Sequence, residues 1–281
     1  MDTSVVKVVM LTGDHPTQAA LAWKIHRAIG VAGIVVAANV PRRLPGRSAR
    51  RIVNAIGART VGRPLTDAWR AVSRRYHRSV EGFPRVDQEH VANVNDTATL
   101  SALDRWDAEL VLVSGTTIVG DRVLRRAARA EGALNLHTGI SPYIKGGPNC
   151  TNWCLARRNY HLIGNTVMWI DPGVDSGNLV ATERTALDGS ESLVDLHWKV
   201  MEHAHDLYGR AAEAIVAGHN VPNVPQSAVG EGPTFRNADW SPGQMARAVR
   251  SFRRHYRTAF TSGRVEREAA SITLIALGSA P

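Results

Sequence analysis

Three polar side chains, Asn135, His137 and Asp175, are the residues whose types could together carry out a reaction. An amide can donate a hydrogen bond to a developing oxyanion, an imidazole titrates near neutral pH, and a carboxylate can orient that imidazole or accept a proton. This set suffices for acyl transfer to an amine, without a metal ion or a serine or cysteine nucleophile. Taken singly, each has an ordinary structural explanation: a turn-capping asparagine, a buried histidine and a turn aspartate.

The spacing of these residues suits a single site. Asn135 and His137 stand two apart at the end of an apolar run, which predicts a strand with both side chains on one face. Ligands of open parallel sheets bind at the carboxyl ends of such strands. A glycine-rich loop over residues 138–149 follows, and Asp175 lies in a dense turn signal over residues 171–177. The two loops are predicted to frame the candidate site.

Other common catalytic signatures are missing from the sequence. No Gly-x-Gly-x-x-Gly follows the first predicted strand, and neither Gly-x-x-x-x-Gly-Lys-Ser/Thr nor Gly-x-Ser-x-Gly occurs, which disfavours dinucleotide enzymes, P-loop ATPases and serine hydrolases. Cys150 and Cys154 have no further cysteine to complete a zinc or iron–sulfur site, so no metal is predicted. A predicted helix carries three histidines that are expected to face solvent, His197, His203 and His205.

Strand and helix patterns alternate along the chain, which predicts an α/β fold. Apolar runs predict strands over residues 5–11, 31–37, 109–114, 133–137, 165–170 and 178–186, with helical stretches between them. The expected architecture is a Rossmann-like open, mostly parallel sheet with helices on both faces. A long helix from about residue 193, a helix opening at Ser241-Pro242 and a last strand over residues 271–277 follow. We expect a catalytic domain over residues 1–187 and a helical C-terminal extension over residues 188–281.

The length and composition of the chain limit the classes of protein to which it can belong. The chain has 281 residues, of which 44% are hydrophobic and 21% charged, as in a globular protein with a full core. No apolar run approaches the roughly 20 residues that cross a bilayer, and the start lacks the basic and apolar regions of a signal peptide. Two cysteines cannot form a disulfide framework. We therefore expect a cytoplasmic protein without a membrane span.

The net charge of +9 comes from one stretch of the chain. Residues 41–85 hold 12 arginines and two acids, whereas the remainder holds 22 basic and 23 acidic residues. Four apolar side chains in this stretch recur at helical spacing and predict an arginine-rich amphipathic helix: Leu65, Trp69, Val72 and Tyr76. Its apolar stripe is expected to pack on the body of the protein or on a second subunit. Recognition of phosphate or diphosphate and contact with a membrane surface are the alternatives.

Two segments resemble signatures of one protein family. Residues 135–147 resemble the signature loop of the folate-dependent formyltransferases, and residues 169–177 resemble their second signature. Residues 108–124 look like the strand and turn that precede these signatures, and residues 192–226 look like the helix and Val-Pro-Gln tail that follow them. The resemblance spans most of residues 5–226 apart from the arginine-rich stretch, and it is closest to bacterial amino-sugar N-formyltransferases.

The resemblance implies transfer of a formyl group from 10-formyltetrahydrofolate to a primary amine that arrives uncharged. Asn135 and His137 would polarise the formyl carbonyl and stabilise the tetrahedral intermediate, and Asp175 would hold His137 and relay the proton lost by the amine. Ten residues are the implied folate contacts: Gly115, Thr116, Thr117, Ile118, Val119, Trp169, Ile170, Asp171, Gly173 and Val174.

The family's range of substrates leaves several acceptors. An amino sugar or a nucleotide-linked amino sugar is expected, because residues 141–152 are most similar to the amino-sugar enzymes and a diphosphate would suit the arginines. Glycinamide ribonucleotide and a hydroxyornithine-like amine are the alternatives within the family. The alternative of another class is a non-catalytic α/β module that binds RNA or an anionic surface through residues 41–85. For the enzyme no nucleic-acid partner is expected, and a homodimer stays open.

Overall fold

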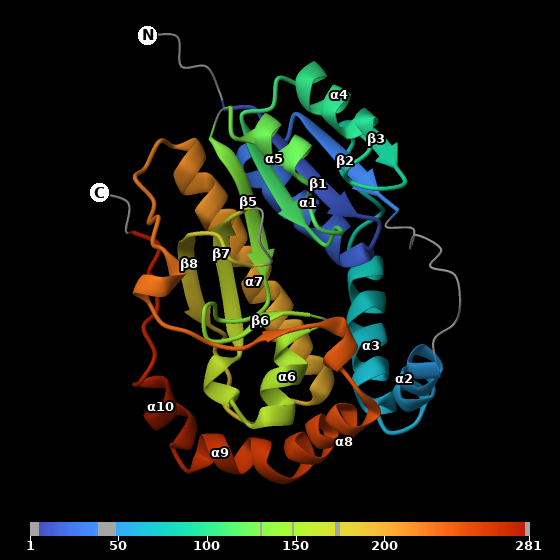
Figure 1. The fold of residues 1–281 in the computed structure, drawn as a ribbon, viewed down its shortest axis with the longest axis vertical. Coiled ribbons are helices and arrows are strands. Elements are labelled where there is room, and N and C mark those ends of the chain that lie inside the picture. Colours follow the sequence, from blue (N-terminus) through green and yellow to red (C-terminus); the bar gives the residue numbers. More distant parts are fainter. Residues whose placement is uncertain (1–5, 39–48, 130, 148, 172–174, 279–281) are drawn as a thin grey trace.

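A seven-stranded sheet forms the centre of the computed structural model, which describes residues 6–38, 49–129, 131–147, 149–171 and 175–278 (Figure 1). Its strands, in spatial order, are β3 (Asp87–Val91), β2 (Gly33–Ala37), β1 (Val8–Gly13), β4 (Leu110–Ser114), β5 (Gly132–His137), β7 (Gly164–Trp169) and β8 (Leu179–Arg184). Neighbours from β3 to β5 run parallel, whereas β7 is antiparallel to both β5 and β8. The prediction of an open, mostly parallel sheet is confirmed.

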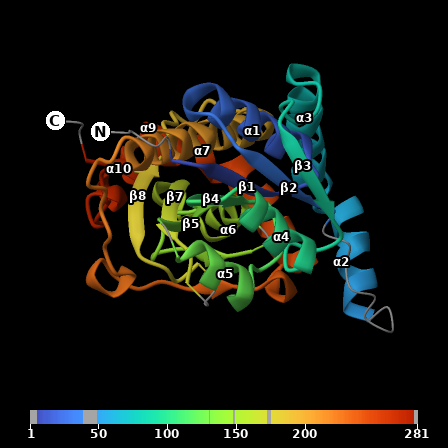
Figure 2. The same ribbon diagram turned by 90° about the horizontal axis from the view of Figure 1, so that it is seen from above.

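Helices cover both faces of this sheet, as predicted (Figure 2). One face carries α1 (Pro16–Ile29) and α7 (Leu193–Val216), and the other carries α4 (Thr97–Arg105) and α5 (Asp121–Ala127). Successive side chains of a strand alternate between the two cores, so Met10 packs with α1 and α7 while Val9 and Leu11 pack with α4 and α5. Because both faces are buried, the inner strands read as continuous apolar runs.

A third core joins the C-terminal helices to α6 (Cys150–Arg157). These helices are α8 (Pro242–Ser251), α9 (Arg257–Thr261) and α10 (Arg264–Ala269). Trp153 of α6 stacks on Phe235 with ring centroids 4.1 Å apart, which links this core to the short pair β6 (Lys145–Gly146) and β9 (Thr234–Phe235). The predicted helical C-terminal part is present, whereas the division at residue 187 stays a prediction. None of the described helices combines the length and hydropathy needed to cross a membrane.

The predicted last strand over residues 271–277 is wrong. This segment contacts β8 through two hydrogen bonds: the Thr182 N–H donates to the Ile275 carbonyl at 2.8 Å, and the Ile275 N–H donates to the Thr182 hydroxyl at 2.7 Å. A side-chain hydroxyl therefore accepts the bond that a backbone carbonyl would accept in a ladder. The Thr273 N–H likewise donates to a side chain, the hydroxyl of Tyr143, at 2.8 Å. The apolar β-branched composition of the segment was a misleading signal.

The arginine-rich stretch contains α2 (Ala49–Arg59) and α3 (Arg63–Ser79), while residues 39–48 lie outside the described part. Three side chains of the predicted apolar stripe are buried, Leu65, Val72 and Tyr76, and Trp69 is half-buried. The Tyr76 hydroxyl donates to Glu202 of α7 at 2.6 Å, and α3 packs on both α1 and α7. The stripe therefore packs on the body of the protein.

Tyr208 of α7 ties two central strands together. Its buried hydroxyl lies 2.8 Å from the Leu134 carbonyl of β5 and 3.1 Å from the Val113 carbonyl of β4. Replacing Tyr208 with phenylalanine keeps the ring but removes this hydrogen bond, so the free energy of unfolding should fall by about 1–3 kcal/mol. Chemical denaturation measures this change. An unchanged midpoint would show that both carbonyls are satisfied without the hydroxyl.

Candidate active site

Strand β5 carries Asn135 and His137 and is fixed from both sides. Its register places Asn135 opposite Val113 of β4 and Met168 of β7, and His137 opposite Thr166 of β7. These pairings hold both side chains at the carboxyl end of β5, where the sheet changes from parallel to antiparallel pairing. Ligands of open α/β sheets bind in the crevice outside the carboxyl ends of the strands.

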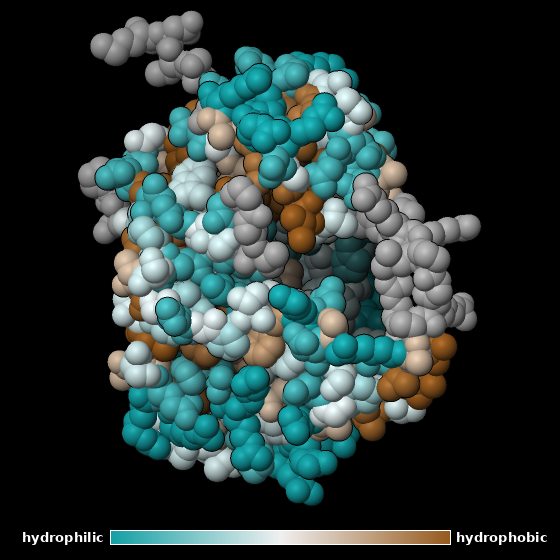
Figure 3. Space-filling model, in the orientation of Figure 1, coloured by the Kyte–Doolittle hydropathy of each residue, from teal (hydrophilic) through white to brown (hydrophobic). Residues whose placement is uncertain are grey.

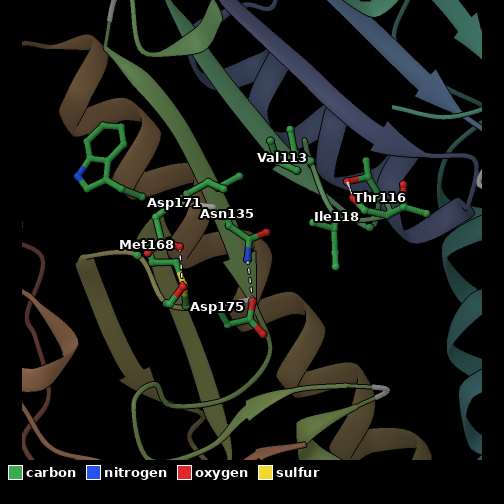
Figure 4. A pocket seen from close by; sticks show the side chains of 14 residues that line it. Val113, Thr116, Ile118, Asn135, Met168, Asp171 and Asp175 are labelled. Carbon is green, nitrogen blue, oxygen red and sulfur yellow. Dashed lines mark hydrogen bonds between the residues drawn. The ribbon is translucent and has the colours of Figure 1, made fainter. Parts of the chain in front are cut away.

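Asp175 reaches the same place from the loop between β7 and β8. Its φ of 49° is a left-handed conformation, which aspartate tolerates better than most residues. Asn135 Nδ2 donates to Asp175 Oδ1 at 3.3 Å (Figure 4). His137 Nδ1 lies 3.4 Å from Asp175 Oδ2, to which the Gly146 N–H donates at 3.0 Å. The structure thus brings the three predicted catalytic residues together; we refer to Asn135, His137 and Asp175 as the polar trio.

The loop that carries Asp175 is held by a residue that sequence reasoning did not single out. Gln226 Nε2 donates to the carbonyls of Asp175 and Gly177 at 2.8 and 2.9 Å. Gly177 itself is required on steric grounds, because a Cβ there would lie 1.8 Å from the Trp169 carbonyl oxygen. Apart from the resemblance, no spacing rule connects Gln226 to a loop so far upstream.

The Nε2 edge of the His137 ring, opposite the edge that faces Asp175, is enclosed by neighbouring residues. Nε2 lies 3.5 Å from Cys150 Sγ, which donates to the Gly146 carbonyl at 3.3 Å. Burial, with a smaller contribution from the Asp175 carboxylate, raises the pKa of the Cys150 thiol, so the sulfur is protonated near neutral pH and is not a nucleophile. A Cβ on Gly139 would lie 2.8 Å from Nε2. The imidazole is therefore packed on one edge and faces Asp175 with the other.

A pocket of about 630 Å³ opens on one side of the polar trio (Figure 4). Eight of the ten predicted folate contacts line it: Gly115, Thr116, Thr117, Ile118, Val119, Trp169, Ile170 and Asp171. The other two, Gly173 and Val174, lie outside the described residues. Asn95 anchors the near wall, since its Nδ2 donates to the Ile118 carbonyl at 2.8 Å and its Oδ1 accepts from the Gly120 N–H at 2.6 Å.

A larger cleft of about 1570 Å³ lies on the other side of the trio. Leu65 and Trp69 of α3 and His197 of α7 line it, together with all three residues of the trio. Asn135 and Asp175 border both this cleft and the first pocket. A group bound in the pocket can therefore meet a group bound in the cleft at the polar trio.

The expectation that the histidines of α7 face solvent is wrong for two of them. His197 and His205 are 2% and 1% exposed, and burial lowers the pKa of His197 to about 4 and that of His205 to about 3. Both side chains are therefore neutral at pH 7. His197 meets the Trp69 ring edge-on with centroids 6.2 Å apart, so the two residues form a rigid wall of the cleft. Helical periodicity could have indicated that His197, four positions after Leu193 and three before Val200, faces inward.

The buried cysteine thiols and the histidines do not form a metal site among the described residues. Among the described residues, no three histidine, cysteine, aspartate or glutamate side chains are arranged so that they could hold a metal ion. His203 instead accepts and donates within a polar cluster, with its Nε2 3.0 Å from Glu183 and its Nδ1 3.0 Å from Thr185.

Sequence comparison places the chain among formyl-transferring proteins. Residues 58–212, more than half of the chain, match the family model described as formyl transferase. The methionyl-tRNA formyltransferase of Methylacidiphilum infernorum is 29% identical over 136 residues, which are 48% of this chain and 41% of that protein. That of Gluconacetobacter diazotrophicus is 30% identical over 155 residues, which are 55% of this chain and 47% of that protein. The chain spans less than half the length of these curated relatives.

Solved structures share the fold over most of the chain. A sugar N-formyltransferase from a Shewanella species has a TM-score of 0.55 and 12% identity, covering 87% of both chains. The N-formyltransferase from Helicobacter canadensis, solved with folinic acid and dTDP-3-aminofucose, has a TM-score of 0.53 and 14% identity, covering 88% of this chain and 80% of that one. The architecture is therefore the formyltransferase fold.

Proposed function

The chain belongs to the formyl transferase family, and from this premise we propose that it transfers a formyl group from 10-formyltetrahydrofolate to a primary amine. One observation carries the proposal: Asn135 and Asp175 border two cavities at once. A transferase must bring a donor and an acceptor to the same reacting atoms, and proximity of this kind can supply much of the rate acceleration.

The smaller pocket suits the formyl donor. A pteridine is a flat heterocycle with many hydrogen-bonding atoms, so it needs apolar walls and backbone polar groups together. Val113, Ile118 and Met168 supply apolar walls, and the backbone of residues 115–119 and 169–171 supplies donors and acceptors. When bound there, 10-formyltetrahydrofolate supplies the formyl group for transfer.

The polar trio has the groups that the transfer requires. The Asn135 amide carries two N–H groups, of which one donates to Asp175 and the other can donate to the formyl oxygen as negative charge develops. The Asp175 carboxylate lies beside Nδ1 and orients the His137 ring, which lines the cleft. Nε2, which lies 3.5 Å from Cys150 Sγ, has to turn toward the formyl oxygen for the imidazole to stabilise the same charge. Asp175 also takes up the proton that the amine loses.

For the acceptor we propose an amino sugar, in particular one linked to a nucleotide. The larger cleft has an aromatic wall in Trp69, on which a sugar ring or a base can pack. Beside the cleft lies a cavity of about 850 Å³ lined by Arg59, Arg63, Arg70 and Asp67, and Ala58 and Thr66 border both. A guanidinium group can donate two parallel hydrogen bonds to the oxygens of one phosphate, so a diphosphate suits this cavity.

An acceptor panel tests this function. The protein is incubated with 10-formyltetrahydrofolate and, in turn, nucleotide-linked amino sugars, unlinked amino sugars, glycinamide ribonucleotide, hydroxyornithine and methionyl-tRNA, and tetrahydrofolate release is measured. We expect the highest kcat/KM with a nucleotide-linked amino sugar. A higher value with any other amine would overturn the acceptor assignment but keep the reaction, and no release with the whole panel would count against both.

The arginine-lined cavity gives a prediction for acceptor binding. Replacing Arg63 and Arg70 together with glutamine should raise the KM of a nucleotide-linked acceptor on the order of 10-fold and leave the KM of the folate nearly unchanged. Both side chains also contact Asp67, at 3.2 and 3.3 Å, so the paired change removes both arginine partners of Asp67 and leaves Arg59 as the one guanidinium among the residues that line the cavity.

A matched pair of arginines on the same helix serves as the control. Arg74 and Arg78 are exposed and do not line the cavity, so their replacement with glutamine should leave both Michaelis constants unchanged. Arg75 is excluded from the design, because its guanidinium lies 3.7 Å from the centre of the Trp198 ring. Equal effects of the two pairs would show that the arginines act through net charge alone.

A further inference from the structure

Large apolar side chains are exposed together on α2 and the turn after it. Ile52, Val53, Ile56 and Val61 are 46%, 52%, 56% and 45% exposed. In the rest of the described chain, large exposed apolar side chains occur singly, as at Leu274. Figure 3 shows the resulting hydrophobic surface at the place that α2 occupies in Figure 1. We refer to these four residues as the α2 apolar face.

The opposite side of α2 explains why these residues point outward. A Cβ on Gly57 would lie 2.5 Å from Pro242 Cγ, and one on Gly62 would lie 2.8 Å from Met245 Sδ. The helix therefore packs on α8 through glycine, with its backbone close to the partner helix. An amphipathic helix of a globular protein normally buries its bulky apolar residues, and here it exposes them. Contiguous exposed apolar surface of this kind marks an interaction site.

The charges around the α2 apolar face select the kind of partner. Arg50 and Arg59 of α2 and Arg63 at the start of α3 are exposed. Two acids lie near them: Asp67, which pairs with Arg63 at 3.2 Å, and Asp239, next to the Ala238 that Arg50 contacts. Arg50 donates to the Ala238 carbonyl, so its guanidinium keeps its full charge. A second copy of the chain meeting this face by two-fold symmetry would bring arginines against arginines. An apolar face flanked by arginines instead complements an anionic lipid surface.

We propose that the α2 apolar face docks the protein onto an anionic membrane surface. Ile52, Val53 and Ile56 enter the boundary between headgroups and acyl chains, and Arg50 contacts lipid phosphates. Arg59 and Arg63, which line the cavity assigned to the acceptor, add positive charge at this surface. The helix lies in the plane of the interface and does not cross the membrane. Ala58 and Gly62, just beyond the apolar face, line the larger cleft, so docking holds the cleft beside the headgroups. This inference does not depend on the proposed formyl transfer.

Co-sedimentation with vesicles tests the proposal. The probes are vesicles of phosphatidylcholine alone and of phosphatidylcholine with about one third phosphatidylglycerol. We expect binding to the anionic vesicles, weakened by added salt, and a loss on the order of 10-fold or more when Ile52, Val53 and Ile56 are all replaced with serine. The matched control is Leu274→Ser, which removes an exposed apolar side chain elsewhere and should leave binding unchanged.

Each other outcome contradicts the proposal. Failure of the wild type to bind anionic vesicles overturns it, as does equal binding by the triple serine variant with an unchanged circular dichroism spectrum. A wild-type dimer in light scattering that the triple variant converts to monomer would assign the face to a second copy. Binding of RNA with no binding of anionic vesicles would assign the arginines to a nucleic acid.

Discussion

Replacing Asp175 with asparagine should lower turnover on the order of 100-fold while the protein stays folded. Both carboxylate oxygens face donors, Asn135 Nδ2 on Oδ1 and the Gly146 N–H and His137 Nδ1 on Oδ2. An asparagine must turn its own NH₂ toward one of these donors, and it cannot accept the proton of the amine. The loss should therefore fall on kcat more than on either Michaelis constant. Steady-state kinetics over a range of pH measures it.

The control for this variant is Asp121→Asn, which removes a carboxylate on α5 that is 68% exposed and lines neither the pocket nor the cleft. It should leave turnover unchanged. If Asp175→Asn keeps full activity over the whole pH profile, Asp175 is a structural residue of its loop and takes no part in proton transfer.

Alanine at Asn135 or at His137 should lower turnover by about 100-fold or more in each case. Each change removes a polar group that stabilises developing charge; Asn135 is half-buried and His137 is buried. The double variant should lose little more than the worse single variant, because residues that act as a unit are not additive. Wild-type turnover in both single variants would contradict the site.

The control for the asparagine is Asn178→Ala. Asn178 bonds the exposed Asn223 at 2.9 Å and should affect neither turnover nor folding. Circular dichroism of all variants separates loss of chemistry from loss of structure.

The inner strands of the sheet were predictable because burial on both faces requires a run of consecutive apolar residues, which is easy to recognise in the sequence. β1, β2 and β4 are largely apolar runs whose residues are all buried, and β5 is buried at three of its six positions. β3 escaped prediction because Gln88, Glu89 and His90 lie at the sheet edge and are polar. Helix α2 was not predicted because its bulky apolar residues face outward, so their spacing does not indicate a face that packs on a core. The structure of edge strands and surface helices depends on contacts with residues far away in the chain, and the local sequence gives no sign of these contacts.

The candidate site divides in the same way. Asn135 and His137 were predictable, since two positions on one strand end share a face, and Asp175 came from its turn signal and the resemblance. The surroundings were not predictable in the same manner: Trp69 and His197 meet across helices far apart in the chain. Cys150 lay near His137 in sequence, yet only the turn of the intervening loop places Sγ at 3.5 Å from Nε2.

Single-turnover transfer of an isotope-labelled formyl group tests whether the polar trio moves a formyl group from the folate to an amine. The protein is mixed with labelled 10-formyltetrahydrofolate and the best amine of the acceptor panel, and product and tetrahydrofolate are quantified together. We expect labelled N-formyl product in amounts equal to the tetrahydrofolate released, with both formed on the order of 100-fold more slowly by His137→Ala. Tetrahydrofolate released without label in the amine, or equal rates for the wild type and His137→Ala, would contradict this expectation.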